Sequence, residues 1–432
     1  MVCVGRAPAR DSIPVAAVLR DGLGRLPVGL SPHRWKVLRA LLACRTGVLG
    51  GQTFECRDCH RQHFVPFACG NRHCPNCQGH LARQWLKQQQ ERLLPAPYFH
   101  LVFTLPHALH PLIRQNLRPV GDLLFAAVSQ TLLQFGRERL GAVIGLTMVL
   151  HTWGQTLGEH YHVHVIATGG GLGADGTWKA APHAGYLFPV HALSQMFRGK
   201  FCAGLGRLWN SGKLKYHGAL GACQGAAAFS ELLHQATRKD WNVHIKRPFA
   251  GPETVLKYLS HYTHRIAISP RRLQDLDLRQ HRVTFQWRDY AKGSQLKPMT
   301  LDTGEFARRF CLHILPQGFA KVRHFGLLAN RGRDQRLQKA REALAKICPK
   351  TPKLRPERKR LPDNTTAREP LAARSVAPSV CVSSKSYARS VAANPEKIAH
   401  DLSRRSSRPV PSRPPARDAP SARQKRMLCS DP

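Results

Sequence analysis

The sequence predicts an α+β fold, in which helices flank a mainly antiparallel sheet, with a small metal-binding module before it and a disordered basic tail after it. Between residues 95 and 335, β-branched apolar segments alternate irregularly with segments of helical periodicity, a pattern typical of α+β layers. Five of the thirteen cysteines fall between Cys56 and Cys77. Past about Arg333 the sequence is basic and helical up to Ile347, and Pro349–Pro432 is rich in Pro, Ser, Ala and Arg and too poor in apolar residues to bury a core.

These shifts in composition divide the chain into five parts. We place the boundaries at 11–48 (an N-terminal helical segment), 49–82 (a zinc-binding module), 95–275 (the central domain), 276–335 (an α/β extension) and 336–432 (the tail). Apolar spacing predicts helices at Arg34–Leu42, Ala82–Leu93, Gly121–Leu140, Ala192–Trp209, Gln224–Thr237 and 302–314. Strands are predicted at Tyr98–Leu105, Gly145–His151, 162–167 and Trp241–Lys246, with a hairpin in 281–301.

The charge of the chain indicates a polyanionic partner. Sixty-six Lys and Arg residues against 26 Asp and Glu give a formal net charge of +40. Such an excess favours nucleic acid through counterion release. No apolar run approaches the ~20 residues needed to span a bilayer, and no basic amphipathic helix dominates. The N-terminus lacks the apolar core of a signal peptide, so we expect a cytoplasmic protein that associates with the nucleoid.

The clustered cysteines predict a structural zinc site. Cys56 and Cys59 form one CxxC pair, Cys74 and Cys77 form a second, and fourteen residues separate the pairs. This approximates the spacing of a closed, tetrahedral four-cysteine zinc site. Cys69 is an additional candidate ligand. A redox CxxC pair is the alternative, but no thioredoxin-like context accompanies the two pairs.

A histidine pair offers a second metal site. His162 and His164 lie in an apolar, β-branched segment that runs into three glycines, which predicts a strand. Because side chains alternate along a strand, both imidazoles project from one face and can share a divalent cation. The alternative is a pair of histidines on a solvated sheet face.

Two tyrosines follow on a predicted helix. The segment Pro252–Thr263 has proline in its first turn and apolar residues at helical spacing. Tyr258 and Tyr262 are four residues apart, so both would point at one site. Their phenols need a cation to attack at neutral pH, and Lys257 and Arg265 could hold phosphate or lower the phenol pKa. The alternative is a pair of tyrosines at the edge of a core.

Together these motifs resemble a known family. The order of His-hydrophobe-His and Tyr-x-x-x-Tyr is similar to that of the HUH endonucleases, and specifically of the two-tyrosine rolling-circle transposases of the insertion-sequence-ninety-one type. The resemblance runs from about residue 32 to residue 330. Further stretches that are similar to recurrent sequence motifs of the family are Cys69–Cys77, His151–Gln155, Lys246–Pro252, Tyr258–Ser269 and His324–Asn330.

The resemblance implies a fold, a site and a reaction. It implies an HUH-type antiparallel sheet, with Mg²⁺ or Mn²⁺ at His162 and His164 and a third ligand that is either His151 or Gln155. Tyr258 and Tyr262 would then attack single-stranded DNA at transposon ends and target site, forming a 5′-phosphotyrosine intermediate. Arg72, Lys257 and Arg265 are the candidate DNA contacts.

Two other classes of protein remain open. A plasmid replication initiator or a relaxase would use the same chemistry, although such proteins usually lack a leading zinc module. A non-catalytic zinc protein that binds nucleic acid would explain the charge and the cysteines, but not the ordered His and Tyr motifs.

Overall fold

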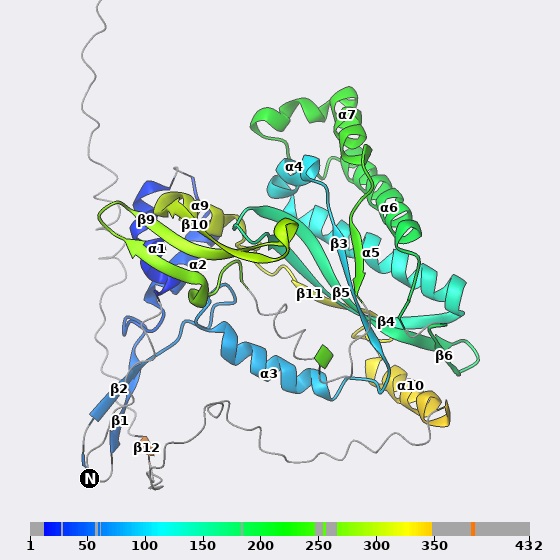
Figure 1. Ribbon diagram of the computed structural model, residues 1–432, viewed down its shortest axis with the longest axis horizontal. Coiled ribbons are helices and arrows are strands. Elements are labelled where there is room, and N and C mark those ends of the chain that lie inside the picture. Colours follow the sequence, from blue (N-terminus) through cyan, green and yellow to red (C-terminus); the bar gives the residue numbers. More distant parts are fainter. Residues whose placement is uncertain are drawn as a thin grey trace, which may run out of the picture. The chain divides into compact units, whose positions relative to one another are not determined.

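An antiparallel sheet of six strands lies at the centre of the computed structural model (Figure 1). The model describes residues 13–26, 29–56, 59–60, 62–182, 185–246, 254–255, 266–347 and 382–384. The strand order is β11-β4-β5-β3-β7, and β6 pairs with β5. The strands are β3 (Tyr98–Thr104), β4 (Ala142–Trp153), β5 (Glu159–Gly173), β6 (Trp178–Ala180), β7 (Val243–Lys246) and β11 (Val322–Gly326).

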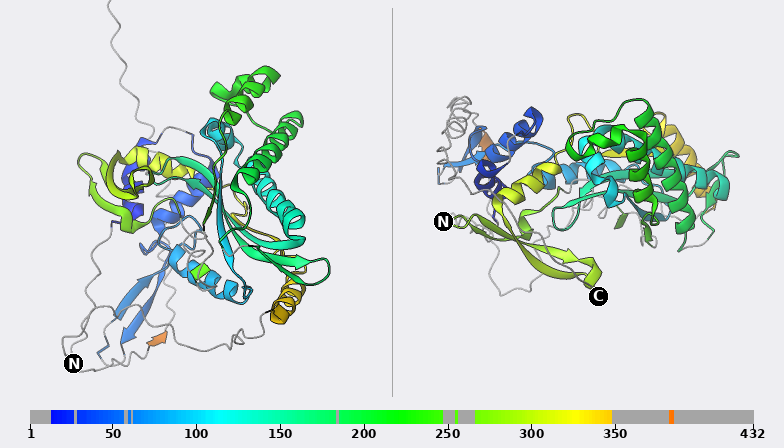
Figure 2. Two further views of the ribbon diagram at one scale, coloured as in Figure 1. Left: turned by 45° about the vertical axis from the view of Figure 1, so that its right-hand side comes forward. Right: turned by 90° about the horizontal axis from the view of Figure 1, so that it is seen from above.

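Helices cover one face of this sheet, as Figures 1 and 2 show. Alternate β5 residues, among them Val163 and Val165, enter a core that also contains Phe125 and Phe197 from these helices. Apolar side chains at every second position of a strand lie on one face of the sheet, and the helices that cover this face remove them from water. The helices of this layer are α4 (His110–Gln115), α5 (Leu117–Leu140), α6 (Val190–Asn210) and α7 (Ala226–Thr237), with the 3-10 turns His107–Leu109 and Gly218–Gln224.

The opposite face of the sheet is polar along β5 and less fully covered. His162 and His164 project from it, and Ile166 follows on the same side. Ile166 and Tyr98 pack there with Val255, and with Trp85 of α3 (Gln78–Gln90). Thr254 and Val255 are helical, whereas the rest of the predicted tyrosine helix lies outside the described residues.

A second core joins the N-terminal helices to the part of the chain between residues 267 and 314. Helices α1 (Val15–Gly22) and α2 (Pro32–Ala43) share it with α9 (Thr303–Leu312) and a three-stranded antiparallel sheet. Gly22 permits the closest approach, because a Cβ there would lie 2.1 Å from the Thr303 carbonyl oxygen. The strands of this sheet are β8 (Leu273–Asp277), β9 (Arg282–Asp289) and β10 (Gln295–Asp302); 3-10 turns occupy Leu23–Arg25, Pro270–Arg272 and Tyr290–Lys292.

A hairpin and a terminal helix complete the fold. Strand β1 (Gly51–Cys56) pairs with β2 (Gln62–Pro66) and with β12 (Val382–Ser384). Helix α10 (Arg333–Ile347) packs beside the main sheet through Leu337, Ala340 and Leu344. This helix continues past the predicted start of the tail at residue 336, and the remaining tail, apart from β12, lies outside the described residues.

The structure confirms the predicted α+β class with an antiparallel sheet flanked by helices. Residues from the predicted segments 11–48 and 276–335 meet in one hydrophobic core. None of the described helices combines the length and apolar character needed to cross a membrane.

Candidate active site and metal centre

Strand β5 brings the predicted histidine pair together on the polar face of the sheet. The neighbouring Val163 and Val165 are buried against the helices, so the alternation of the strand turns both imidazoles the other way. The two Nε2 atoms lie 3.1 Å apart. Such proximity allows both rings to ligate one cation.

The next strand supplies a third imidazole. His151 of β4 stands directly opposite His162 in the strand register. Its ring centroid lies 4.5 Å from that of His164, and one nitrogen from each of the three rings lies within 4.8 Å of the others. Gln155, the other predicted candidate, is directed elsewhere, since its amide Nε2 donates to Tyr290 Oη at 3.2 Å on the surface. The geometry therefore selects His151.

Burial keeps the imidazoles of His162 and His164 neutral, which is the form that binds metal. Desolvation lowers the pKa of His162 to about 3, and it lowers the pKa of His164 well below the usual value, helped by the charge of His162. His162 donates its Nδ1 proton to the carbonyl oxygen of His160 at 2.9 Å. Its Nε2 lone pair consequently points into the cluster.

A fourth histidine orients His164. His100 of β3 places its Nε2 2.9 Å from His164 Nδ1, and the two rings stack. When His164 offers its Nε2 lone pair to a cation, its Nδ1 proton must be donated to His100. His100 itself is buried, and desolvation lowers its pKa to about 3, so it remains a neutral acceptor. Sequence reasoning did not select His100, because its position depends on the pairing of β3 with β5.

The predicted nucleophiles Tyr258 and Tyr262, with Lys257 and Arg265, lie outside the described residues. The chain on either side of them is described. Val255 is fully buried and packs with Ile166, which follows His164 on the same face of β5. Ala267 and Ile268 belong to the core that includes Trp153, whose ring stacks on His151 at 4.4 Å. The chain before the tyrosine segment therefore packs on the sheet face that carries the histidine cluster, and the chain after it enters the core that contains Trp153.

The cysteine cluster has a different membership from the predicted set. The structure groups Cys44, Cys69, Cys74 and Cys77, whose sulfur atoms all lie within 4.8 Å of one another. Measured Sγ–Sγ distances are 3.5 Å from Cys74 to Cys44, and 3.7 Å from Cys77 to both Cys44 and Cys69. Four sulfurs around a zinc ion with bonds of about 2.3 Å would be about 3.8 Å apart.

The predicted ligands Cys56 and Cys59 are not part of this cluster. Cys56 ends β1, and Cys59 follows it in the connection to β2. The base of this hairpin, where Gly51 pairs with Pro66, lies next in sequence to the cluster. Cys56 is five residues further out along the strand, a distance of about 17 Å. The hairpin thus separates the two CxxC pairs, and it brings Cys44 and Cys69 together at its base.

The chemistry of the cluster fits zinc. Burial raises the pKa of the Cys69 thiol to about 11 and raises that of Cys74 still further, while hydrogen bonds from neighbouring thiols and backbone lower that of Cys44 against the effect of burial. Without a cation, the thiols of Cys69 and Cys74 would hold their protons. A zinc ion supplies the positive charge that stabilises thiolates.

Hydrogen bonds join the cysteine loop to the segment that enters the polar sheet face. Arg72 Nη1 donates to the carbonyl oxygen of Phe319 at 2.8 Å, and the Leu315 amide donates to His73 Nε2 at 3.1 Å. The same segment leads to Lys321, whose Nζ lies 4.9 Å from the centroid of the Trp153 ring. Arg72, predicted to contact DNA, therefore has a structural role at this junction.

Comparison with known proteins identifies the two halves of this arrangement. The family model described as "Transposase zinc-binding domain" matches residues 22–105, which contain all four clustered cysteines. The model described as "Putative transposase" matches residues 145–336, which contain the three clustered histidines and both predicted tyrosines. No solved structure matches the chain.

Two similar proteins align with most of the chain. The "Putative transposase y4qJ" of Sinorhizobium fredii is 41% identical over 346 residues, which cover 79% of this chain and 86% of that protein. The "Transposase for insertion sequence element IS801" of Pseudomonas savastanoi pv. phaseolicola is 30% identical over 333 residues, with coverages of 76% and 78%. These matches confirm the resemblance expected from the sequence. The chain belongs to the IS91-type family of insertion-sequence transposases.

Proposed function

We propose that this transposase cuts and rejoins single-stranded DNA at transposon ends through a 5′-phosphotyrosine intermediate, in rolling-circle transposition. The observation that carries the proposal is the cluster of His151, His162 and His164, with Val255, which precedes the tyrosine segment, packed on the same sheet face. Tyr258 follows Val255 by three residues in the sequence.

The three imidazoles would hold one divalent cation, Mg²⁺ or Mn²⁺. When bound, this ion supplies a Lewis acid that neutralises the charge developing on the scissile phosphate. His100 orients His164 for this role through their shared hydrogen bond. The neutral state of His162 and His164 leaves a lone pair on each ring available at physiological pH.

The tyrosines would act as nucleophiles. The phenol of Tyr258 or Tyr262 gives up its proton as its oxygen bonds to phosphorus, the bond from phosphorus to the 3′ oxygen breaks, and that oxygen takes up one proton to become a 3′-hydroxyl, so that protons balance. The DNA then remains attached to the protein through its 5′ phosphate. A second tyrosine on the same helical face permits a second cleavage before the first end is released.

The cysteine cluster would hold a structural Zn²⁺ through Cys44, Cys69, Cys74 and Cys77. Four thiolate ligands close the coordination shell, so this ion stabilises the fold and has no open position for a reacting group. Its place in the protein is to fix α2, the β1–β2 hairpin and the start of α3 around one point.

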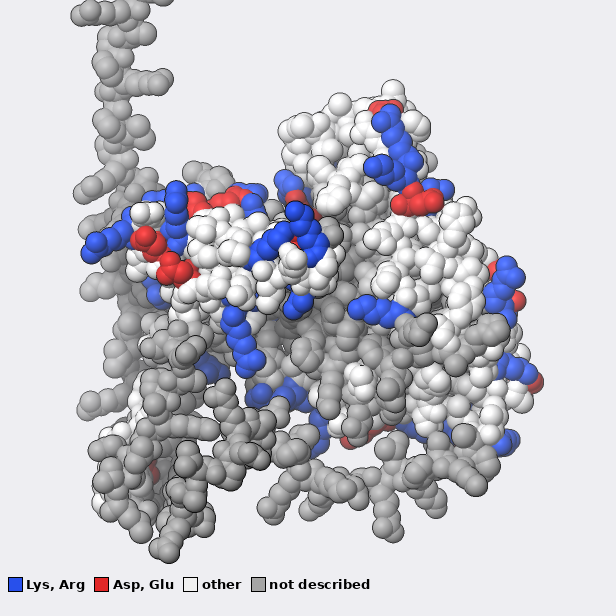
Figure 3. Space-filling view, in the orientation of Figure 1, with Lys and Arg blue, Asp and Glu red and all other residues white. Residues whose placement is uncertain are grey.

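The surface charge is consistent with a DNA substrate. Figure 3 shows Lys and Arg side chains over more of the drawn surface than Asp and Glu side chains. A net charge of +40 gives a strong, salt-dependent attraction for phosphate backbones.

Cleavage of a labelled single-stranded oligonucleotide from the element's own end tests the proposal. We expect a nick that depends on added Mg²⁺ or Mn²⁺ and is lost in His162→Ala. Unchanged cleavage in His162→Ala would remove the histidine cluster from the reaction. Arg139→Ala on the surface of α5 is the matched control and should cleave as the wild type does.

A further inference from the structure

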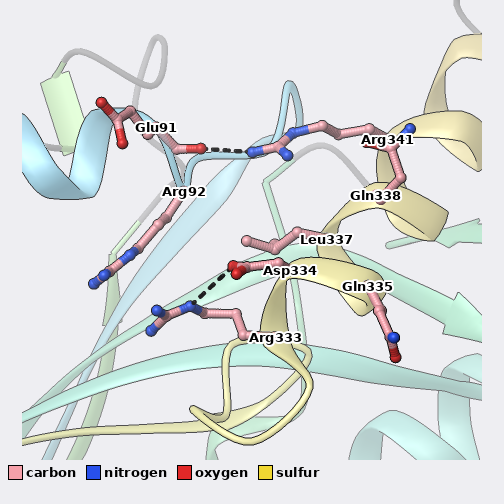
Figure 4. Close-up of a pocket in the computed structure, with 8 residues that line it drawn as sticks. All are labelled: Glu91, Arg92, Arg333, Asp334, Gln335, Leu337, Gln338 and Arg341. Atoms are coloured by element: carbon pink, nitrogen blue, oxygen red, sulfur yellow. Dashed lines mark hydrogen bonds and ion pairs between the residues drawn. The ribbon is translucent and has the colours of Figure 1, made fainter.

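A cavity of about 720 Å³ lies between the end of α3 and the first turns of α10, away from the histidine cluster (Figure 4). Its charged lining consists of three arginines and two acidic residues, namely Arg92, Arg333, Arg341, Glu91 and Asp334. The proposed function does not use this cavity.

Among the described residues, Arg92 and Arg333 lack a strong partner, whereas Arg341 has one. Arg341 Nη2 donates to the backbone carbonyl oxygen of Glu91 at 2.6 Å, and that hydrogen bond ties α10 to the end of α3. Arg333 Nη1 donates to Asn330 Oδ1 at 3.2 Å, but its buried Nε has no hydrogen-bond partner in the described part of the chain. Asp334 lies 3.8 Å from that Nε and is 96% exposed, so it contributes little.

Arg92 and Arg333 act on each other as like charges. Burial lowers the pKa of the Arg92 guanidinium, and the positive charge of Arg333 lowers it further, while the carboxylates of Asp334 and Glu91 offset only part of this shift. Figure 4 shows both guanidinium groups extending to the same side of the cavity, while the Glu91 carboxylate points away from Arg92. Two cations that face one space are stabilised by an anion between them, and arginine forks match phosphate oxygens.

This pair lies at the edge of the sheet face that carries the histidine cluster. His324 of β11 is buried, and the charges of Arg333 and Arg92 add to burial in lowering its pKa to about 4. Its Nδ1 lies 3.0 Å from Thr147 Oγ1, and Thr147 stands opposite Ile166, two residues beyond His164. Two strand spacings and two residues along a strand put His324 on the order of 12 Å from His164.

We propose that Arg92 and Arg333 form a binding site for a backbone phosphate of the single-stranded DNA, a few nucleotides from the phosphate held at the histidine cluster. This site rests on the proposed function for the identity of its ligand. Phosphate contacts of this kind fix the register of the strand without reading its sequence. The site would therefore position the scissile bond.

Salt dependence of DNA binding tests the site directly. The probe is a fluorescent single-stranded oligonucleotide, titrated by anisotropy without Mg²⁺ or Mn²⁺ at several salt concentrations. Each lost phosphate contact should reduce the slope of log K against log salt by about 0.7 for a single strand. We expect this reduction in Arg92→Gln and in Arg333→Gln.

Two controls separate this result from a loss of fold or of net charge. Arg139→Gln removes one charge from the exposed surface of α5 and should keep the wild-type slope. Arg92→Lys retains the cation and should also keep it. Arg333→Gln removes the hydrogen bond to Asn330 and could unfold the protein for that reason. Arg92→Gln would still test the site, because the Arg92 side chain makes no hydrogen bond among the described residues.

A neutral methylphosphonate linkage, moved along the oligonucleotide, locates the contact. At one position it should weaken binding by the wild type but not by Arg92→Gln. Slopes equal to that of the wild type in both arginine variants, an equal fall in Arg139→Gln, or no binding of single strands at all would overturn the site. Because binding is measured without cleavage, a changed slope in a protein that forms no adduct would instead refute the proposed chemistry alone.

Discussion

His151 of β4 lies directly opposite His162 of β5, and their ring centroids are 5.3 Å apart on the polar face of the central sheet. This cross-strand pair turns a two-histidine motif into a three-nitrogen cluster. The third ligand that we propose, His151, is placed by the register between neighbouring strands and not by the loop that follows β4.

Replacing the third histidine should separate it from the other candidate. We expect His151→Ala to weaken Mn²⁺-dependent cleavage by more than about tenfold, since loss even of a residue that orients a ligand costs about 10–100-fold. Gln155→Ala, whose amide contacts Tyr290 on the surface, should cleave at close to the wild-type rate. Initial cleavage rates over a Mn²⁺ titration provide the measurement. The reverse order of the two variants would assign the ligand to Gln155.

Loss of the histidine behind the cluster should act on metal affinity. In His100→Ala, His164 loses its Nδ1 partner, and we expect the apparent Mn²⁺ affinity to fall by about 10–100-fold. His244→Ala, on the exposed end strand β7, is the control and should leave the affinity unchanged. Equal Mn²⁺ affinities for His100→Ala and the wild type would show that His164 needs no such support.

Zinc content should follow the cysteine cluster of the structure. We expect Cys44→Ala to lose the metal and to unfold at a lower temperature, because structural zinc contributes directly to folding free energy. Cys56→Ala, at the far end of β1, should keep a full complement of zinc. Elemental analysis of the two purified variants decides the matter. If Cys44→Ala retained zinc and Cys56→Ala lost it, the ligands would instead be the cysteines predicted from the sequence spacing.

Part of the candidate site can be predicted from the sequence, and part depends on contacts that the sequence does not show. Period-two alternation correctly placed His162 and His164 on one face, because the intervening valines must enter the core. The spacing of Cys56 and Cys59 suggested ligands, but a hairpin inserted between Cys44 and Cys69 brings distant residues together. No local sequence pattern predicts that a hairpin will bring these two cysteines together.

Contacts between segments that are far apart in the sequence could not be predicted from the sequence either. The approach of His100 to His164 depends on the pairing of β3 with β5, and the facing of Arg92 and Arg333 depends on how α10 packs. The roles of Tyr258 and Tyr262 stay predictions from the sequence motif and its family. The anchors on either side of them narrow the place in which they can act.

Stability should fall on mild acidification, in part through His313. This ring is buried, donates Nε2–H to the Leu157 carbonyl oxygen at 2.9 Å and lies 3.1 Å from Thr152 Oγ1. Burial lowers its pKa from 6.5 to about 4. Between these values the unfolded chain takes up a proton that the folded chain does not, so stability is full above pH 6.5 and is lost toward pH 4.

A shift of this size corresponds to about 3 kcal/mol. His313→Gln should be less stable at neutral pH, and its stability should depend less on pH within that window. Urea unfolding at a series of pH values gives the comparison. Parallel curves for the variant and the wild type would exclude His313 as a source of the acid sensitivity.

The most direct test of the account is to find where DNA becomes attached to the protein. The purified transposase is incubated with labelled single-stranded DNA from its element end and Mn²⁺, and the adduct is digested and sequenced by mass spectrometry. We expect the phosphate on Tyr258 or Tyr262, and no adduct in the Tyr258→Phe/Tyr262→Phe variant, which should still bind the DNA. An adduct that persists in this double variant, or that maps to another residue, would contradict the assignment.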